Sequence, residues 1–494
     1  MENSILVLLP PVIAIVMAII TKQVIFSLGS GIIIGGLMLN GFNPLSTLEY
    51  LSTTLMESVA DPKWNTPIIV FCLLLGGIIG MVSRSKATIS FSHWAAKRVK
   101  TRRGAMLTTW ILGMLMFIDD YFNSLSVGAV MRPITDKMNV SREKLAYILD
   151  STAAPVCIIA PVSTWIAFVM SIMAEEFTRY GIDKNPFSAF ISIIPFNFYA
   201  ILALVMVVFI AIVGKDFGPM KRAEEMQSRA TSVKQEEISS NSTVWDLVIP
   251  IGSLVFMTLL AMIWTGGYFT ADISLWVAFT ESDPAFSLIY GGLIAVVITF
   301  AMYAIKRTLP FGEIFESFVD GMKTMMGVIV VLALAWTIGA VIGDLNVRTY
   351  IADIVADGSI PMFLIPVTMF LISALVAFST GSSWGTFSIM VPIAIATAVA
   401  GPTSFIYAAL GAVLGGAVLG DHCSPISDST ILSSAGADCS HIDHVNTQLP
   451  YALVPGGFAL IGSIMVGVGI NHYIVLTLCI AAMLGFLHVI LNKN

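Results

Sequence analysis

The sequence predicts an all-α, polytopic membrane protein with about eleven transmembrane helices and two re-entrant hairpins. Two observations support this class. Of the 494 residues, 57% are hydrophobic and 11% are charged, whereas soluble proteins carry about 25% charged residues. The mean hydropathy is +0.89, and apolar stretches of about 20 residues, enough to cross a bilayer core as a helix, recur along the chain. We therefore expect a lipid bilayer to surround most of the protein.

The apolar stretches give the order of the spans. They lie near residues 5–20, 24–42, 67–83, 145–172, 190–213, 244–265, 286–305, 325–343, 404–432, 450–468 and 472–491. The first follows Met1-Glu2-Asn3-Ser4, which has no basic segment. We therefore interpret it as a retained span and not as a cleaved signal peptide.

Two further apolar stretches, 105–138 and 362–400, have polar centres and are interpreted as hairpins. Their arms of about 12–14 residues reach about 20 Å as helix, which is less than the bilayer core of about 30 Å. Basic residues precede and follow 105–138, and short basic loops face the cytoplasm. Both ends of this stretch therefore lie on one side, and the stretch is predicted to be re-entrant.

Loop charges also predict the orientation. The bases that define the cytoplasmic side are Arg84, Lys86, Lys97, Arg98, Lys100, Arg102, Arg103, Lys137, Arg142, Lys144, Lys215, Lys221, Arg222, Arg229, Lys234, Lys306, Arg307 and Lys493. This distribution predicts an external N-terminus and a cytoplasmic C-terminus in the inner membrane.

A polar segment at 214–243 has no apolar periodicity and is interpreted as a cytoplasmic linker with a short surface helix. It separates a first half, 1–213, with hairpin 105–138 and interrupted helix 145–172, from a second half, 244–494, with hairpin 362–400 and interrupted helix 404–432. Residues 130–134 match 389–393, and residues 160–164 match 424–428. An odd number of predicted crossings separates the matched elements, so the repeats are inverted. Inverted repeats with interrupted helices at the bilayer midplane are typical of secondary transporters.

The polar residues of these elements predict a cation site. The candidates for binding Na⁺ or a proton are Asp119, Asp120, Asn123, Ser124, Asp150, Thr152, Ser163, Ser382, Ser383, Thr386, Asp421, Ser424, Ser427 and Asp428. Carboxylate, amide, hydroxyl and carbonyl oxygens are the ligands that hard cations prefer, and charges inside an apolar region indicate function. The structural alternative for Asp119 and Asp120 is that both cap a helix.

Two further side chains have alternative roles. His422 is either a proton relay or pH sensor, or a structural histidine that donates to a nearby carboxylate. Trp384 lines a substrate cavity or packs the hairpin tip.

A buried carboxylate loses its hydration, which favours its protonated form. It therefore holds a proton or Na⁺, but not both, and this competition is sufficient for antiport when access to the site alternates.

Other classes are excluded. Five cysteines form no CxxC pair, and no nucleotide loop, zinc site or nucleophile elbow is present. We expect no enzymatic activity, no cofactor, no transition metal and no nucleic-acid partner. An Asp421, His422 and Ser424 hydrolytic set is disfavoured by its apolar setting.

Several motifs resemble the NhaC-type Na⁺/H⁺ antiporters of the ion transporter superfamily. They are Asp119-Asp120-Tyr121-Phe122-Asn123, Thr380-Gly381-Ser382-Ser383-Trp384-Gly385-Thr386-Phe387, Gly420-Asp421-His422-Cys423-Ser424-Pro425-Ile426-Ser427-Asp428-Ser429-Thr430-Ile431-Leu432-Ser433-Ser434, His441-Ile442-Asp443-His444-Val445 and Gln448-Leu449-Pro450-Tyr451. The resemblance spans roughly residues 65–460. It implies inverted repeats, cation sites at two re-entrant hairpin tips and, often, a homodimer with an elevator-like transport domain.

The predicted function is Na⁺/H⁺ exchange by alternating access, with buried aspartates that bind either ion. The alternative is a Na⁺- or H⁺-coupled exchanger or symporter of an organic acid or amino acid, which the resemblance also implies. The candidate site carries more Asp than Arg, so a cationic or zwitterionic organic substrate fits its charge better than an anion.

Overall fold

A computed structural model describes residues 5–21, 23–63, 65–87, 90, 99–227, 242–346, 361–399, 401–425 and 427–493. Within these ranges every regular element is helical and no strand occurs. The predicted all-α class is confirmed.

The helices are named in chain order. They are α1 (Leu9–Thr21), α2 (Val24–Leu39), α3 (Pro44–Ala60), α4 (Asn65–Ser85), α6 (Arg102–Leu115), α7 (Asp120–Lys137), α8 (Arg142–Cys157), α9 (Thr164–Arg179), α10 (Pro186–Ile193), α11 (Phe198–Val213), α12 (Gly218–Gln227), α13 (Trp245–Thr265), α14 (Leu275–Thr280), α15 (Pro284–Lys306), α16 (Phe311–Thr324), α17 (Met326–Asp344), α19 (Ile365–Thr380), α20 (Ser383–Ala398), α21 (Thr403–Cys423), α22 (Asp428–Ala437), α23 (His441–Gly467) and α24 (His472–Lys493). Three short 3₁₀ segments, Ile5–Leu8, Ile194–Phe196 and Met362–Leu364, adjoin α1, α10 and α19.

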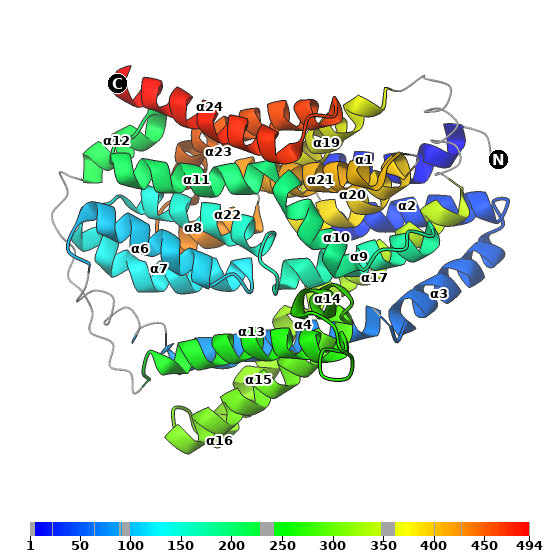
Figure 1. Ribbon diagram of the computed structural model, residues 1–494, viewed down its shortest axis with the longest axis horizontal. Coiled ribbons are helices and arrows are strands. Elements are labelled where there is room, and N and C mark those ends of the chain that lie inside the picture. Colours follow the sequence, from blue (N-terminus) through cyan, green and yellow to red (C-terminus); the bar gives the residue numbers. More distant parts are fainter. Residues whose placement is uncertain are drawn as a thin grey trace.

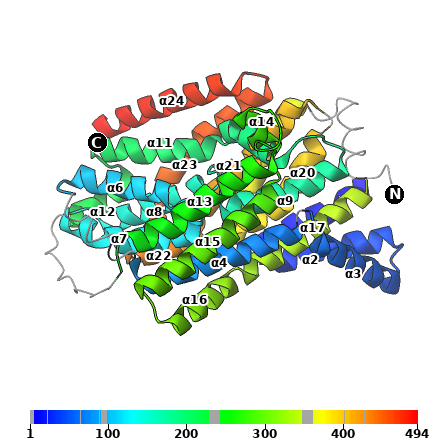
Figure 2. The same ribbon diagram turned by 60° about the horizontal axis from the view of Figure 1, so that its bottom comes forward.

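The described helices form a main bundle and a peripheral group. The peripheral group consists of α4, α13, α15 and α16, which pack on one another and lie along the bottom of the view in Figure 1. The rotated view in Figure 2 shows α11 and α24 on the face opposite to α4 and α16. Helix α9 contacts both parts, because it packs against α20 of the bundle and against α4.

In the described ranges, eight helices are long and apolar enough to cross a membrane, or nine when the bent pair 186–196 and 198–213 counts as one span. The predicted number of eleven is therefore not confirmed. Helices α1 and α2, with 13 and 16 residues, are shorter than α4, α13 and α21, which have 21 residues each. The sequence also gave no indication of α3 and α16, whose sequences mix apolar and polar residues.

Each stretch interpreted as a hairpin contains two helices joined by a tight turn. The prediction that all arms are too short to cross a membrane is not confirmed, because residues 362–380 are long and apolar enough to do so. In 105–138 the arms are α6 and α7, and in 362–400 they are α19 and α20. The second turn contains Gly381, whose φ of 66° is a left-handed conformation that favours glycine.

In each half, a break between two helices follows the paired helices. Helix α8 ends at Cys157 and α9 begins at Thr164; α21 ends at Cys423 and α22 begins at Asp428. The second arm of each hairpin packs against the helix that follows the break in the other half: α7 against α22, and α20 against α9. This exchange brings both hairpin tips and both breaks into one region.

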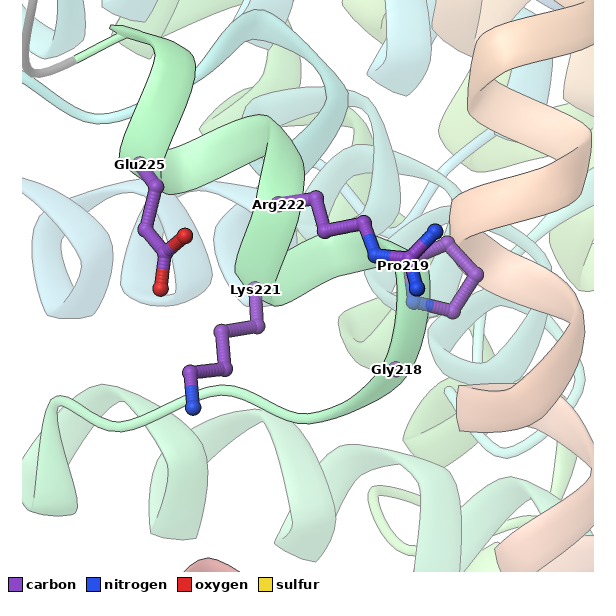
Figure 3. A pocket seen from close by; sticks show the side chains of 5 residues that line it. All are labelled: Gly218, Pro219, Lys221, Arg222 and Glu225. Atoms are coloured by element: carbon purple, nitrogen blue, oxygen red, sulfur yellow. The ribbon is translucent and has the colours of Figure 1, made fainter. Parts of the chain in front are cut away.

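Helix α12 occupies the beginning of the predicted linker. Its buried side is tied to the bundle by Glu224, which accepts hydrogen bonds from the backbone N–H and hydroxyl of Ser141 at 3.1 and 3.0 Å and pairs with Arg102. A surface pocket at the start of α12 is lined by Gly218, Pro219, Lys221, Arg222 and Glu225 (Figure 3). None of the predicted ion-binding residues lines this pocket.

Candidate ion-binding site

Four helices begin in the region where the tips and breaks meet. Each has a polar N-cap whose side chain accepts a hydrogen bond from the first turn: Asp119 for α7, Ser163 for α9, Ser382 for α20 and Ser427 for α22. The N-terminus of a helix carries a partial positive charge and stabilises a nearby anion. This region is therefore suited to carboxylates although it is closed to bulk water.

Asp119 lies at the first hairpin tip and is 3% exposed. Its Oδ1 accepts a hydrogen bond from the N–H of Phe122 at 2.9 Å, and its Oδ2 accepts one from the Thr164 hydroxyl at 3.2 Å. The Thr164 N–H also donates to the carbonyl of Ile118 at 2.9 Å. Asp119 thus has the capping geometry of the structural alternative, and it joins the tip to the start of α9.

Asp120 is the first residue of α7 and is 2% exposed. Its Oδ1 accepts a hydrogen bond from the indole N–H of Trp165 at 2.8 Å. It also lies near enough to Asp421 and to the thiol of Cys157 for electrostatic interaction. Asp120 does not cap α7, so the structure separates the roles of the two adjacent acids.

Asn123 lies one turn beyond Asp120 and is fully buried. Its amide N–H groups donate to the carbonyls of Gly113 at 2.9 Å and Thr152 at 3.2 Å. These two bonds fix the amide, whose Oδ1 has no hydrogen-bond partner among the described residues. A buried oxygen without a donor is unfavourable, and a bound cation would satisfy it.

Asp421 lies near the end of α21 and is 3% exposed. Its Oδ1 accepts a hydrogen bond from Ser427 at 2.7 Å, and its Oδ2 accepts from Ser383 at 3.0 Å and Ser429 at 3.3 Å. These hydroxyls come from the second hairpin and from α22. The structure thus brings together three residues predicted for the site, Ser383, Asp421 and Ser427, and adds Ser429.

Asp150, in the middle of α8, has a different environment. The hydroxyls of Thr430 and Ser433 donate to its two oxygens at 3.1 and 3.4 Å, and the Gln448 amide also donates to it. The Nε2 of His444 lies 3.5 Å from Asp150 Oδ2. Because donors surround this carboxylate, it is a less open cation ligand than Asp120.

The contacts of His422 differ from the predicted bond to a carboxylate. Its Nδ1 lies 2.9 Å from the hydroxyl of Tyr199, and its Nε2 is buried without a hydrogen-bond partner among the described residues. The packing alternative for Trp384 fits its contacts, because its ring lies 5.5 Å from Trp165 and 4.8 Å from Phe168.

Several predicted residues donate hydrogen bonds to backbone carbonyls. The hydroxyls of Thr152, Ser163, Thr386 and Ser424 donate to the carbonyls of Ile148, Cys157, Ser382 and Phe378. Ser124 accepts from Ser433 at 3.1 Å. Ser382 acts as the cap of α20, and Asp428 is the first residue of α22.

Sequence reasoning missed Thr164, Trp165, Ser429, Thr430, Ser433, His444 and Gln448 as contacts of the aspartates. Thr164 and Trp165 directly follow the predicted cap Ser163, and Ser429 follows Ser427 in the same way. Their position in the first turn after a break was the available signal, because first-turn residues face whatever lies at the helix terminus.

The profile of the Na⁺/H⁺ antiporter family matches residues 156–468. This range includes the second hairpin, both breaks and the acid at the end of α21.

Among curated proteins, an "uncharacterized protein" of Haemophilus influenzae is 42% identical over 475 residues, which cover 94% of this chain and 91% of the relative. An uncharacterized Na⁺/H⁺ antiporter of the same organism is 31% identical over 150 residues, 28% of this chain and 31% of the relative. The malate-2H⁺/Na⁺-lactate antiporter of Bacillus subtilis is 27% identical over 205 residues, 40% of this chain and 41% of the relative.

Two solved structures share the fold. The YdaH transporter of Alcanivorax borkumensis superposes with a TM-score of 0.59 at 13% identity, covering 86% of this chain and 90% of that chain. MtrF of Neisseria gonorrhoeae gives a TM-score of 0.53 at 16% identity, covering 85% and 84%. At these identities the likeness concerns the fold alone.

Proposed function

This chain belongs to the Na⁺/H⁺ antiporter family, and on that premise we propose that it exchanges Na⁺ for H⁺ across its membrane, with Asp120 and Asp421 as the carboxylates that bind either ion. One observation carries the assignment. Both acids are almost completely buried, one from each half of the chain, at a point where helix N-termini meet. A buried acid in a membrane protein is costly and indicates function.

The oxygens around Asp120 and Asp421 suit Na⁺. The hydroxyls of Ser383, Ser427 and Ser429 already contact Asp421, and the fixed amide oxygen of Asn123 lies one turn from Asp120. Carboxylate, hydroxyl and amide oxygens are the donors that hard cations take. No Lys or Arg of the described residues forms a salt bridge with Asp119, Asp120 or Asp150, so a cation from solution would supply the missing positive charge.

Exchange of Na⁺ for H⁺ follows from competition between the two ions for the same carboxylates. When the site opens to the side with more Na⁺, the metal ion displaces the proton from a carboxylate; when it opens to the other side, a proton displaces Na⁺. An empty pair of ionised acids is unfavourable in a low-dielectric interior, because like charges repel and their hydration is lost. The site therefore changes its orientation more readily when an ion is bound, which couples the two fluxes.

An organic substrate is the second candidate, because the Bacillus subtilis relative is named for malate and lactate. We retain it as an exchanger or symporter that uses the same cation site. The described charges around Asp120 and Asp421 are acidic, so a cationic or zwitterionic substrate would fit better than a free carboxylate.

Reconstitution into vesicles that contain a pH-sensitive dye separates the two candidates. Addition of NaCl alone should release protons from the vesicles if the protein is a Na⁺/H⁺ antiporter. If flux starts only when an organic solute is added, the second candidate is correct.

Substitution tests the site within the same assay. Asp120→Asn and Asp421→Asn should each abolish Na⁺-driven proton flux while the protein remains folded. The matched control is Asp320→Asn, because Asp320 is 56% exposed and pairs only with Lys323 on α16. Undiminished flux in both site variants would remove the assignment.

We further propose the inner membrane, an external N-terminus, a cytoplasmic C-terminus and a homodimer as the setting of this exchange. The division into halves 1–213 and 244–494 around the 214–243 linker agrees with the recurrence of hairpin and interrupted helix. Cysteine labelling of the loops from the two sides of the membrane tests the orientation.

A further inference from the structure

A second group of buried and half-buried polar residues lies at the far end of α9 from Trp165. It consists of Glu175 and Glu176 in the last turn of α9 and Asn65 at the start of α4. Arg179 pairs with both glutamates: its NH2 lies 2.9 Å from Glu175 Oε1, and its NH1 contacts Glu176 Oε1. None of these residues belongs to the site described above.

This group contains more buried oxygen acceptors than hydrogen-bond donors. Glu176 is 1% exposed and Asn65 is 3% exposed. Glu176 Oε2, Glu175 Oε2 and Asn65 Oδ1 are buried and have no hydrogen-bond partner among the described residues. The side-chain amide N–H of Asn65 donates to the carbonyl of Ser58 at 2.8 Å, which sets the orientation of the amide, and the same amide forms a side-chain hydrogen bond with Glu175. Asn65 and Glu176 thus both lie near Glu175. Buried oxygens without a donor call for a proton, a water molecule or a cation.

The charge of the surroundings favours a cation. Arg179 faces the two glutamates, and Asp61 lies near enough to Glu175 for electrostatic interaction. Three acidic side chains thus lie around one arginine and its partners, and the C-terminus of α9 adds partial negative charge.

The packing holds the group in place between the bundle and the peripheral helices. A Cβ on Gly339 of α17 would lie 2.4 Å from Glu176 Oε1, and one on Gly343 would lie 2.1 Å from Arg179 Cδ. The two glycines therefore form the surface on which the Glu176–Arg179 pair rests. The carboxylate cannot swing away without leaving this contact.

We propose that Glu175, Glu176 and Asn65 form a second Na⁺ site at the end of α9. Oxygen ligands without donors, a net negative environment and a fixed amide together match a hard cation. The same helix carries Trp165, the partner of Asp120, at its other end. The site exists independently of whether the central aspartates carry out exchange.

The test measures Na⁺ binding without transport, in the Asp120→Asn/Asp421→Asn double variant. The readout is the half-life of thermal inactivation in detergent at fixed temperature, in NaCl and in choline chloride of equal ionic strength. Stabilisation by a ligand of the native state grows with 1 + [Na⁺]/Kd, so Na⁺ at about ten times Kd should lengthen the half-life about tenfold. Adding Glu176→Gln should abolish the lengthening.

Two further variants keep the result interpretable. Asn65→Ala, which removes the unpaired amide oxygen and leaves every charge, should also weaken the Na⁺ effect if Glu176→Gln does not fold. Glu313→Gln is the matched control, because Glu313 is 41% exposed and pairs with Arg84 on the surface of α16; it should retain the effect. No Na⁺ effect in the double variant, an effect that survives Glu176→Gln, or a response to CaCl₂ alone would overturn the assignment.

Discussion

The contact between α7 and α22 offers the sharpest test of how the site is assembled. A Cβ on Gly128 of α7 would lie 2.6–2.7 Å from the backbone of Gly436, and one on Gly436 would lie 2.4 Å from the carbonyl of Ser124. The two helices therefore touch through their backbones. One turn from this contact, Ser433 of α22 donates to Ser124 at 3.1 Å.

Gly128→Ala should push the helices apart by about 1 Å, because carbon atoms pack at about 3.5–4.0 Å. Overpacking of this kind costs about 1–3 kcal/mol. The matched control is Gly457→Ala on α23, where a Cβ would meet no atom within 4 Å. Both substitutions gain about 1 kcal/mol of helix propensity, so the difference between the two variants isolates the cost of the contact.

The assay is the half-life of inactivation at fixed temperature, combined with Na⁺-driven proton flux in vesicles. If the whole cost lowers the unfolding barrier, Gly128→Ala should inactivate about 5- to 150-fold faster than Gly457→Ala. Its flux should fall as well, because Asp120 lies two turns along α7 from Gly128 and α22 carries the hydroxyls that reach Asp421. Equal half-lives and equal flux in the two variants would refute the reasoning.

Three further predictions follow from single contacts. Trp165→Phe keeps an aromatic ring but removes the indole donor 2.8 Å from Asp120. A hydrogen bond to a charged group is worth about 1.5–3 kcal/mol, and its loss makes the ionised form of Asp120 less favourable. Protons should then compete better, and the Na⁺ concentration for half-maximal flux should rise about tenfold or more. Ser427→Ala removes both the cap of α22 and a donor to Asp421; it should cost about 1 kcal/mol of stability for the cap and should lower flux, whereas Ser440→Ala, the cap of α23, should cost stability alone. Burial raises the pKa of Glu224, and the nearby Lys144 and Arg102 partly offset this effect. The folded protein therefore holds this proton more tightly than the unfolded chain, and the contribution of Glu224 to stability is lost as pH rises through the folded pKa. Glu224→Gln should reduce the pH dependence of the inactivation half-life in this range.

The sequence was sufficient for the elements of the site, because their limits are set locally. Gly381 adopts a left-handed conformation that favours glycine, and Pro425, which lacks a backbone N–H, lies just after the end of α21. The capping residues Ser163, Ser382 and Ser427 have polar side chains in otherwise apolar stretches. Turn and cap chemistry of this kind is independent of the tertiary fold, so the positions of these turns and helix ends could be predicted. That the hairpins are re-entrant stays a prediction.

The pairing of side chains could not be predicted, because it depends on how the halves cross. Thr152 and Thr430 have similar positions in the sequence, since each follows an aspartate, Asp150 or Asp428, by two residues. Only the contact of α22 with α7 and α8 places Thr430 against Asp150, while Thr152 bonds to its own helix. Composition alone also does not reveal where a helix ends. The sequence therefore predicts full spans at the short helices α1 and α2.

The two halves have matching polar positions at their tips and breaks, but the acid occupies a different position in each half. In each half the N-cap after the break reaches back six residues: Ser163 donates to the carbonyl of Cys157, and Ser427 donates to the carboxylate of Asp421, both at 2.7 Å. Cys157 is thus the counterpart of Asp421. At the tips, the first residue of α7 is Asp120 and the first residue of α20 is Ser383.

Each half therefore combines one acid with one weakly polar partner: Asp120 with Cys157, and Asp421 with Ser383. The second residue after each cap, Trp165 or Ser429, donates to the acid of its own half. Four acids at these positions would place four like charges in one buried region, which repulsion and lost hydration oppose. Two acids at these four positions limit the buried charge, to which Asp119 beside Asp120 also contributes. Because Asp120 lies on a hairpin and Asp421 on an interrupted helix, a relative movement of these elements changes the separation of the two charges. Such a movement would alter the affinity for Na⁺ and for protons at the same time, which is what coupled exchange requires.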